Sequence, residues 1–478
     1  MQTTEDILKA IESDVEGITS KMLGDLITQF RSKEGKKRQK LWDRYTLEDV
    51  PIYHHEVANF IKVNEKLAHD FYADIVDTKT GYMGNEVTTT LNREKYKTDG
   101  VLDETEYQAD REHLRDFQIK TSSEDENSEI VGLAGATGIG YRLLWVPEGK
   151  NDVMTMNLDP WEVIYIFDAS LNEAVAALRF WTMDALEFGH KNKAKEITVV
   201  EWYDKTDVTY YIDNADMIFH LDLSKGTEGS QPHLFTGVPI IPFPNNGLEF
   251  AEPQKVVTLI DGYDTIMSAT VSEIEQFRLA YMFAKGAGLF VDDVFIKKME
   301  QTGVFPLPGD GEIGFINKEL AMDGIKIILD EIRRNIYLFG KSIDTSKDND
   351  GDIRVIGWQV ALLKLENSAV VTERKFKKAL REQYRMLTDY WTKFQGVTID
   401  PMSIEFTFTR NFPKDIQAEA ETLLLLLDGV SRDTAYSQMS FIDDPEAEIK
   451  KVELEQSPFR EGALGGDQEP DNQQSTST

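Results

Sequence analysis

Three long stretches of helical periodicity, each free of proline, lie between Pro253 and Gln395 and constrain the fold more than any other feature. In each stretch apolar or aromatic residues recur at steps of three and four, the spacing that lines up on one face of an α-helix. At 1.5 Å per residue, a helix over 254–281 would be roughly 40 Å long. The sequence therefore predicts three helices that are long for a globular protein. Their apolar positions are Val256, Ile260, Tyr263, Met267, Val271, Ile274, Phe277 and Tyr281; then Ile325, Ile328, Ile332, Ile336 and Phe339; and then Trp358, Leu362, Leu365, Ala369, Phe376, Leu380, Tyr384, Leu387 and Trp391.

The segments between these helices are polar or rich in glycine and proline. Within the insert 282–318 the sequence predicts a short strand at 289–291, a helix at 293–301 and a hairpin in which 304–306 pairs with 312–316. The loop 342–357 lacks the first acidic ligand and the final glutamate of an EF-hand, so we do not interpret it as a calcium site. This arrangement suits an elongated subunit with functional segments at both ends, although an intramolecular bundle is the ordinary alternative.

Short strands dominate the region from Tyr141 to Pro242, where Val, Ile, Thr and aromatic residues alternate with turn residues. We expect an antiparallel β region within an α+β fold, ending at the proline-rich boundary 239–247. A further strand is expected at 403–410, followed by helices around 414–428, 431–437 and 444–456 and a disordered tail over 457–478. The predicted strands of the β region are 141–146, 153–158, 163–168, 174–183, 197–203, 208–212 and 217–221.

Helical patterns precede the strands. We predict helices at 5–30 and 59–77, an exposed loop at 121–127, and a solvated surface connection over the basic segment 31–44. The glycines of 135–140 resemble a dinucleotide-binding loop, but an acidic, serine-rich sequence precedes them where that motif needs a buried strand. We interpret them as a turn or a close-packing point.

The composition bounds the class of protein. At 478 residues we expect two to four domains, and the absence of cysteine excludes disulfides and thiolate metal sites. The first residues lack the pattern of a signal peptide, and no apolar run is long enough to span a bilayer, so we expect a soluble protein without membrane contact. The net charge of −32, from 84 acidic against 52 basic residues, argues against tight nucleic-acid binding but not against DNA sliding past.

No catalytic constellation is recognisable in the sequence. The seven histidines all precede the helical half, and neither a Walker loop nor a nucleophile elbow is present. His54, His55 and Glu56 do not form a metal site, because adjacent side chains diverge in a helix and in a strand. The sequence therefore favours a structural or interaction protein without cofactor or metal over an enzyme that uses paired carboxylates.

Several separated segments resemble the portal proteins of tailed bacteriophages, in the branch found in long-tailed phages of Gram-positive hosts. Their order and spacing carry the resemblance, which covers about residues 40–455. The segments are Ile75–Lys79 with Gly81, Tyr82 and Gly84; Pro242–Asn246 with Gly247; Leu259–Asp264; Leu365–Asn367 with Glu373–Leu380; and Ser437–Pro445.

The resemblance implies a portal fold that assembles as a ring of twelve subunits around a DNA channel. In this fold long stem helices carry an α/β clip insert, beside a mixed α/β wing and a helical crown. The implied parts are a wing over 1–252, including the antiparallel region 141–242; stem helices at 253–281 and 319–341; a clip at 282–318; a tunnel loop at 342–357; a long wing or channel helix at 358–399; and a crown at 400–456.

The same resemblance implies that the ring sits at the portal vertex of the virion capsid, after assembly in the host cytoplasm. It would serve DNA packaging, head–tail joining and DNA ejection. The implied partners are double-stranded DNA, the terminase ATPase, a head-completion or adaptor protein, and the major capsid and scaffolding proteins. Another ring or scaffold protein of the phage particle is the alternative.

Three groups of residues are candidates for function. Lys347, Asp348, Asn349 and Arg354 belong to the implied tunnel loop, where the two cations would contact phosphates; a plain solvated linker is the alternative. Phe305, Ile313 and Phe315 in the clip are candidates for partner contacts, because a small insert cannot bury them all. Six cations form a basic surface on the third helix, for which pairing with carboxylates of neighbouring subunits is favoured over DNA contact: Arg374, Lys375, Lys377, Lys378, Arg381 and Arg385.

Overall fold

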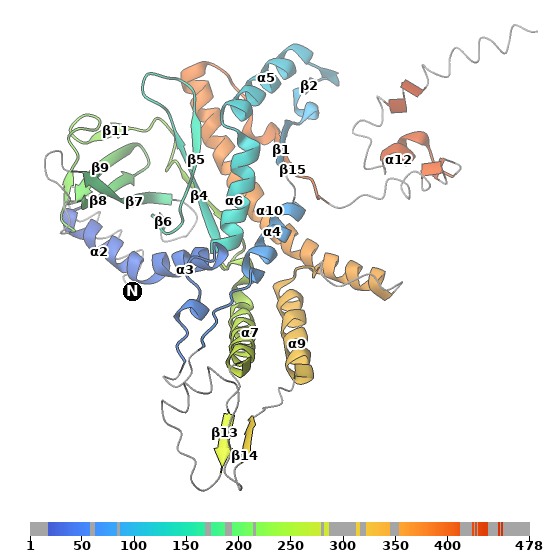
Figure 1. Cartoon of the computed structure of the whole chain (residues 1–478). Helices are drawn as coiled ribbons and strands as arrows, with labels where there is room; N and C mark the ends of the chain where they lie inside the picture. The colour runs from blue at the N-terminus through green and yellow to red at the C-terminus, as the bar shows by residue number, and fades with distance from the viewer. Residues whose placement is uncertain are drawn as a thin grey trace, which may run out of the picture. The chain divides into compact units, whose positions relative to one another are not determined.

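A computed structural model describes residues 18–57, 63–83, 87–167, 174–186, 194–213, 217–278, 282–285, 312–315, 322–344 and 353–411, with shorter stretches between 423 and 452. The chain divides into two compact units, Met1–Arg410 and Asn411–Thr478. The first unit contains both helices and antiparallel strands, which confirms the predicted α+β class (Figure 1). The second unit contains α12 (Arg432–Ser437), at the position predicted for a helix.

The predicted β region forms two sheets in which every described strand pair is antiparallel. A six-stranded sheet has the order β10-β9-β8-β7-β6, with β11 also paired to β9, and a three-stranded sheet has the order β12-β4-β5. All seven predicted strands are present with small shifts at their ends. They correspond to β4 (Ile139–Trp145), β5 (Met154–Leu158), β6 (Val163–Phe167), β7 (Ala174–Leu186), β8 (Ala194–Tyr203), β9 (Asp207–Asp213) and β10 (Phe219–Leu221); β11 (Ser230–Pro232) and β12 (Ile240–Pro244) are additional.

Strand β12 was not predicted, because its two prolines mark it as a boundary in the sequence. Proline cannot donate to a strand ladder and is therefore tolerated at a sheet edge. In the order β12-β4-β5 this strand has one strand neighbour, and its apolar residues Ile240, Ile241 and Phe243 are buried. The proline-rich stretch is thus an edge strand and not only a domain boundary.

Helix α10 (Ile353–Tyr390) organises the largest core, and a π-helical turn extends it to Gln395. Its residues Phe376, Leu380, Tyr384 and Leu387 are buried together with residues of α5 (Glu104–Lys120), α6 (Ser123–Thr137) and β12. The helix begins at Ile353, whereas the sequence placed its start after a loop ending at 357. Residues 353–357 are therefore the first turn of a helix and do not belong to the expected loop 342–357.

The predicted strand at 403–410 is confirmed, but it belongs to the first unit. Strand β15 (Ile404–Phe408) pairs with β1 (Val87–Leu91), so that Val87 lies opposite Phe408 and Leu91 opposite Ile404. The inward residues of this pair join the core around α10. The first unit therefore extends beyond residue 400, to Arg410.

The other two long helices are α7 (Val257–Arg278) and α9 (Met322–Gly340), which lie side by side (Figure 1). Both pack at one end against α4 (Phe71–Met83). The core that joins the three helices contains Ile75, Val256, Ile260 and Ile336. The two helices predicted from periodicity in this region are confirmed.

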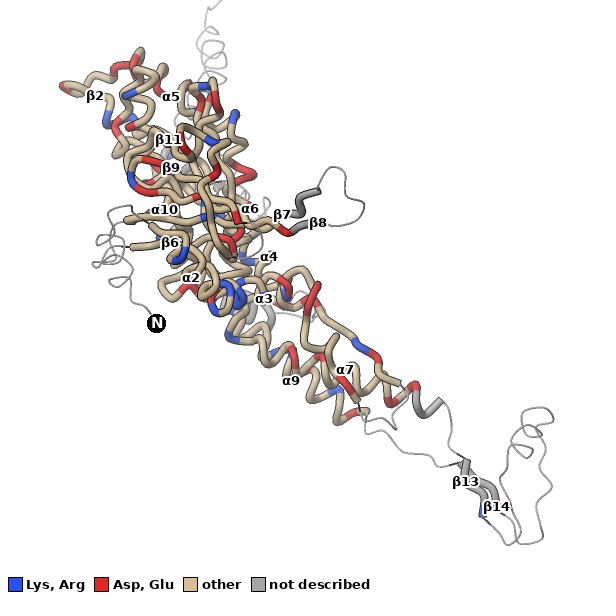
Figure 2. Tube along the Cα trace, turned by 90° about the vertical axis from the view of Figure 1, so that its left-hand side faces the viewer, with Lys and Arg blue, Asp and Glu red and all other residues tan. Residues whose placement is uncertain are grey.

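In the N-terminal part of the first unit one prediction is wrong and another missed a helix. The predicted loop 121–127 is the start of α6, and Thr121 and Asn127 are buried. The basic segment 31–44 is helical, since it continues α2 (Ser20–Phe30) through a π-helical turn into α3 (Lys36–Tyr45), where Lys and Arg residues gather (Figure 2). Most of its cations are exposed, as predicted. Within it Arg38 is 9% exposed and contacts the carbonyl of Pro160 and the Glu249 carboxylate.

Of the helix predicted at 59–77, the structure describes α4 from Phe71 onward, whereas residues 63–69 form an extended strap along α7. Residues 59–62 lie outside the described residues. Side chains on three successive turns of α7 accept hydrogen bonds from alternate backbone N–H groups of this strap. Four helical residues rise about 6 Å and two extended residues span about 6.6 Å, so the two spacings match. The pairs are His69 N–H with Asp264 Oδ1 at 3.1 Å, Leu67 N–H with Ser268 Oγ at 2.9 Å and Glu65 N–H with Ser272 Oγ at 2.8 Å.

Gly138 ends α6 with φ of +96° and lets strand β4 start immediately. A Cβ atom at this position would lie 2.1 Å from the Glu249 carbonyl oxygen, so only glycine fits. This confirms the interpretation of the glycine cluster as a turn and a close-packing point.

Candidate functional site

A buried ion pair joins α4, α10 and the turn η4 (Glu252–Lys255) that leads into α7. The Lys79 ammonium donates to Glu252 Oε2 at 2.6 Å, to Asn245 Oδ1 at 3.0 Å and to Thr372 Oγ1 at 2.8 Å. Ser368 Oγ donates to the other Glu252 oxygen, and Thr372 Oγ1 donates to the Asn245 carbonyl. We call these five residues the Lys79 network. All three ammonium protons are bonded, which a buried charge requires.

Burial and charge pairing shift the pKa values of Lys79 and Glu252 in opposite directions. Burial lowers the pKa of Lys79, and the facing Glu252 carboxylate offsets part of that change. Burial raises the pKa of Glu252, but the Lys79 charge and hydrogen bonds from Lys79, Ser368 and Asn245 more than offset it, so this pKa lies below its ordinary value. The network is therefore a charged joint between helices, held by partners on several elements.

Two of the segments that carry the family resemblance contribute residues to this network. Lys79 ends the segment 75–79, Asn245 lies in the segment 242–246, and Ser368 and Thr372 lie between the segments 365–367 and 373–380. Glu252 was not singled out by the sequence analysis. A signal was available, since Lys79 occupies a buried position in the helical spacing of Tyr72, Ile75, Val76 and Met83. A lysine in an apolar stripe predicts a buried partner, although it cannot name one.

A second charged cluster surrounds Arg410, the last residue of the first unit. Its guanidinium donates to Glu366 at 2.8 and 3.1 Å and to Glu373 at 2.6 Å, both on α10. The Tyr82 hydroxyl donates to Glu366 at 2.7 Å, and burial together with this carboxylate raises the pKa of Tyr82 to about 12. The end of β15 is thereby fixed to α10 and to the last turn of α4.

The six cations predicted to form a basic surface lie on α10, but they differ in their partners. Lys377 pairs with Glu373 at 2.7 Å, and Arg385 pairs with Glu382 at 2.6 Å. Arg374, Lys378 and Arg381 are exposed, and none of them has an ion-pair partner among the residues that the structure describes. Some cations of this surface are thus paired with carboxylates of their own helix, and others have no carboxylate partner among the described residues.

Of the four candidates for DNA contact, one lies among the residues that the structure describes. Lys347, Asp348 and Asn349 lie outside the described residues. Arg354 lies in the first turn of α10, one residue after its start. The structure therefore separates Arg354 from the loop to which the sequence assigned it.

Two of the three clip candidates, Ile313 and Phe315, lie in a two-stranded sheet. Strand β14 (Glu312–Phe315) pairs with β13 (Met282–Lys285), which places Ile313 opposite Ala284 and Phe315 opposite Met282. The predicted partner of β14, residues 304–306, lies outside the described residues; the strand pairing that the structure describes joins β14 to the start of the insert. Phe305 and the helix expected at 293–301 lie outside the described residues.

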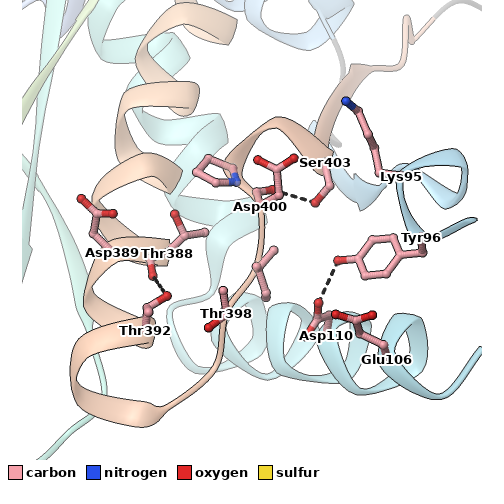
Figure 3. A pocket seen from close by; sticks show the side chains of 12 residues that line it. Lys95, Tyr96, Glu106, Asp110, Thr388, Asp389, Thr392, Thr398, Asp400 and Ser403 are labelled. Atoms are coloured by element: carbon pink, nitrogen blue, oxygen red, sulfur yellow. Dashed lines mark hydrogen bonds between the residues drawn. The ribbon is translucent and has the colours of Figure 1, made fainter. Parts of the chain in front are cut away.

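A polar cavity of about 420 Å³ lies between α5 and the C-terminal end of α10. Figure 3 shows Tyr96 directed toward Asp110 at this cavity, and the Tyr96 hydroxyl donates to Asp110 Oδ2 at 2.9 Å. Burial raises the pKa of Asp110. The lining residues are Lys95, Tyr96, Glu106, Asp110, Thr388, Asp389, Thr392, Thr398, Ile399, Asp400, Pro401 and Ser403.

The cavity does not supply a recognisable reaction centre. Its hydroxyl groups are largely bonded to nearby backbone, as with Ser403 Oγ to the Asp400 carbonyl at 2.7 Å. Among the residues that the structure describes, no group of three or more His, Asp or Glu side chains is placed so that it could hold a metal ion. Nor is any described helix both long and apolar enough to cross a membrane.

Comparison with known proteins gives one consistent result. The sequence profile of the family described as "Phage portal protein, SPP1 Gp6-like" matches residues 30–458. The portal protein of Bacillus phage SPP1 is 26% identical over 430 residues, covering 85% of this chain and 79% of the relative. The portal protein of Clostridium phage phiCD119 is 21% identical over 422 residues, covering 84% of this chain and 87% of the relative.

Proposed function

The chain belongs to the SPP1 Gp6-like family of phage portal proteins, and from this premise we propose that it forms a ring of twelve subunits around the DNA channel at one capsid vertex. The family is one of structural proteins of the phage particle, and the portal function follows from the match over residues 30–458. The ring, its stoichiometry and its contacts are the proposed part. The family match over most of the chain carries this proposal.

One structural observation supports assembly. Helix α9 buries one side against α7 and α4, while Ile327, Ile328 and Phe339 on its other sides remain 69%, 52% and 59% exposed. An isolated soluble subunit gains nothing from several large apolar side chains in water on one helix, whereas a neighbouring subunit would cover them. We therefore assign α7 and α9 to the stem of the ring.

The other parts are assigned by the same reasoning, with the corrections above. The wing would comprise 1–252 and the long helix α10, the clip 282–318, the tunnel loop 342–352, and the crown would start after Arg410. During assembly in the host cytoplasm the clip would bind the terminase ATPase and later a head-completion or adaptor protein. The wing and crown would face the major capsid and scaffolding proteins.

Electron microscopy of the purified protein tests the proposal. We expect rings with an open centre, and we expect the variant Ile327→Asp/Phe339→Asp to give fewer rings because it places charge on the face to be covered. A compact monomer under all conditions would exclude the portal ring. Rings that admit no double-stranded DNA would favour another ring or scaffold protein of the particle.

A further inference from the structure

One face of α10 is exposed along six residues that follow each other at helical spacing. Leu363, Asn367 and Val371 form its first half, and Arg374, Lys378 and Arg381 its second half. Steps of four, four, three, four and three residues keep all six on one side of the helix. We call this face the outer α10 stripe. Leu363 and Val371 are 60% and 44% exposed, although the opposite side of the same helix forms the main core.

The three cations of the stripe differ from Lys377 and Arg385 on the same helix. Lys377 and Arg385 have carboxylates of their own helix at 2.7 and 2.6 Å. Over the described residues no carboxylate lies within ion-pair distance of Arg374, Lys378 or Arg381. In a chain with 84 acidic and 52 basic residues, these three cations on one helix face remain available to carboxylates from outside the subunit.

The composition of the stripe indicates what that partner is. Phosphates attract Arg and Lys but gain nothing from Leu363 and Val371. A protein interface combines both properties, because its centre is apolar and its edge carries charged pairs. The excess of carboxylates that gives this chain its net charge of −32 makes a second copy the complementary partner.

We propose that the outer α10 stripe is a subunit interface, in which Leu363 and Val371 pack against a second copy and Arg374, Lys378 and Arg381 pair with its carboxylates. This inference rests on the proposed ring. It adds the surface that fixes neighbouring subunits at the level of the wing. Because the charged half is at the edge, assembly depends on ionic strength.

Zero-length carbodiimide cross-linking of a 1:1 mixture of ¹⁴N- and ¹⁵N-labelled protein tests the contact. Lys378 is expected to link to an Asp or Glu in peptide pairs that mix the two labels, and mass spectrometry then identifies that carboxylate. Links of Lys378 within single-label pairs only, in preparations that form rings, would overturn the proposal.

Charge reversal tests whether ring assembly requires the outer α10 stripe. The variant Lys378→Glu/Arg381→Glu is expected to form at least tenfold fewer rings, and Val371→Asp also fewer. The control Lys150→Glu/Lys225→Glu changes the net charge by the same amount as Lys378→Glu/Arg381→Glu, at exposed cations far from α10 in the sequence. This control is expected to form rings normally. Circular dichroism of each variant shows whether the fold is kept, and Lys378→Gln/Arg381→Gln is the milder replacement if it is not.

The outcomes separate the two levels of inference. If the unaltered protein forms no rings, the proposed function fails. If it forms rings and Lys378→Glu/Arg381→Glu does so equally well, the interface is wrong while the function stands. If that variant forms rings but retains less packaged DNA, the stripe is a nucleic-acid contact and the subunit interface is excluded.

Discussion

The Lys79 ammonium lies 2.6 Å from the Glu252 carboxylate, although the two residues are 173 positions apart in the sequence. Their side chains are only 5% and 8% exposed. The pair therefore connects α4 to the turn that starts α7, and through Ser368 and Thr372 to α10. Helices α4 and α10 and the turn that starts α7 are thus joined by a buried charge and not by apolar packing alone.

Removing one partner of this pair should be costly. We expect Lys79→Met to lower the free energy of unfolding by about 3–5 kcal/mol, because it leaves the Glu252 carboxylate buried without a counter-charge. Arg93→Met is the matched control, since Arg93 and Glu104 are exposed and 4.0 Å apart and such pairs contribute at most about 1 kcal/mol. Urea unfolding of both variants measures the difference. Similar losses in the two variants would contradict a special role of the network.

The strap along α7 should depend on the two serine acceptors. We expect Ser268→Ala/Ser272→Ala to lower the free energy of unfolding by about 1–3 kcal/mol, at about 0.5–1.5 kcal/mol for each lost hydrogen bond. Hydrogen exchange at the amides of Glu65 and Leu67 should become faster. Thr265→Ala is the control, because that hydroxyl bonds within its own helix to the Asp261 carbonyl. Unchanged exchange at both amides would show that the strap is held by other contacts.

Glu162 should make the stability of the first unit depend on pH. Burial raises its pKa from 4.5 to about 7, and Asp159 adds to this change. Between these values the folded protein binds more protons than the unfolded chain, so the free energy of unfolding falls as pH rises from about 4.5 to 7. We expect Glu162→Gln to remove this slope and to stabilise the protein at pH 8 by about 1–2 kcal/mol. Thermal melts at pH 5 and pH 8 test it; equal shifts at both pH values would exclude Glu162 as the cause.

The predicted phosphate contacts can be tested in assembled particles. We expect Lys347→Ala/Arg354→Ala to leave ring formation intact but to shorten or weaken the retention of packaged DNA. Each exposed contact contributes up to about 1 kcal/mol, and the effect would be multiplied by the number of subunits. Lys150→Ala/Lys225→Ala removes the same charge elsewhere. Full-length packaging and normal infectivity with Lys347→Ala/Arg354→Ala would contradict the prediction that these two residues contact DNA phosphates.

The clip should serve partner binding more than folding. Deleting 303–311 with a short glycine bridge removes Phe305 but keeps β14 and its pairing with β13. We expect soluble rings that no longer package DNA or complete heads, measured by particle yield and by binding of the head-completion protein. A change at Lys225, far from the insert in sequence, serves as the control. Complete loss of soluble protein would mean that the deleted segment belongs to the core of the subunit.

Local pattern was sufficient for much of the fold. The apolar steps of three and four in α7, α9 and α10, and the strands from β4 to β10, follow from residues close together in the sequence. Such a periodicity is set by helix or strand geometry and needs no knowledge of the partner. The order of the segments from Ile75 to Pro445 was likewise enough to indicate the family, which the comparisons then confirmed.

Only the tertiary structure decided which distant residues meet. The strand after residue 403 was predictable, but its pairing with Val87–Leu91 was not, because two strands of similar composition pair equally well in many arrangements. Thr121–Asn127 has the polar composition of a loop, yet it leads into α6, and Thr121 and Asn127 are buried only because other elements pack against them. In the same way, Lys79 in the apolar stripe of α4 indicated a buried charge, yet Glu252 became its partner only when the chain brought α4, η4 and α10 together. Secondary structure depends on spacing along the chain, whereas the pairing of charges and strands depends on distances that only the complete fold sets.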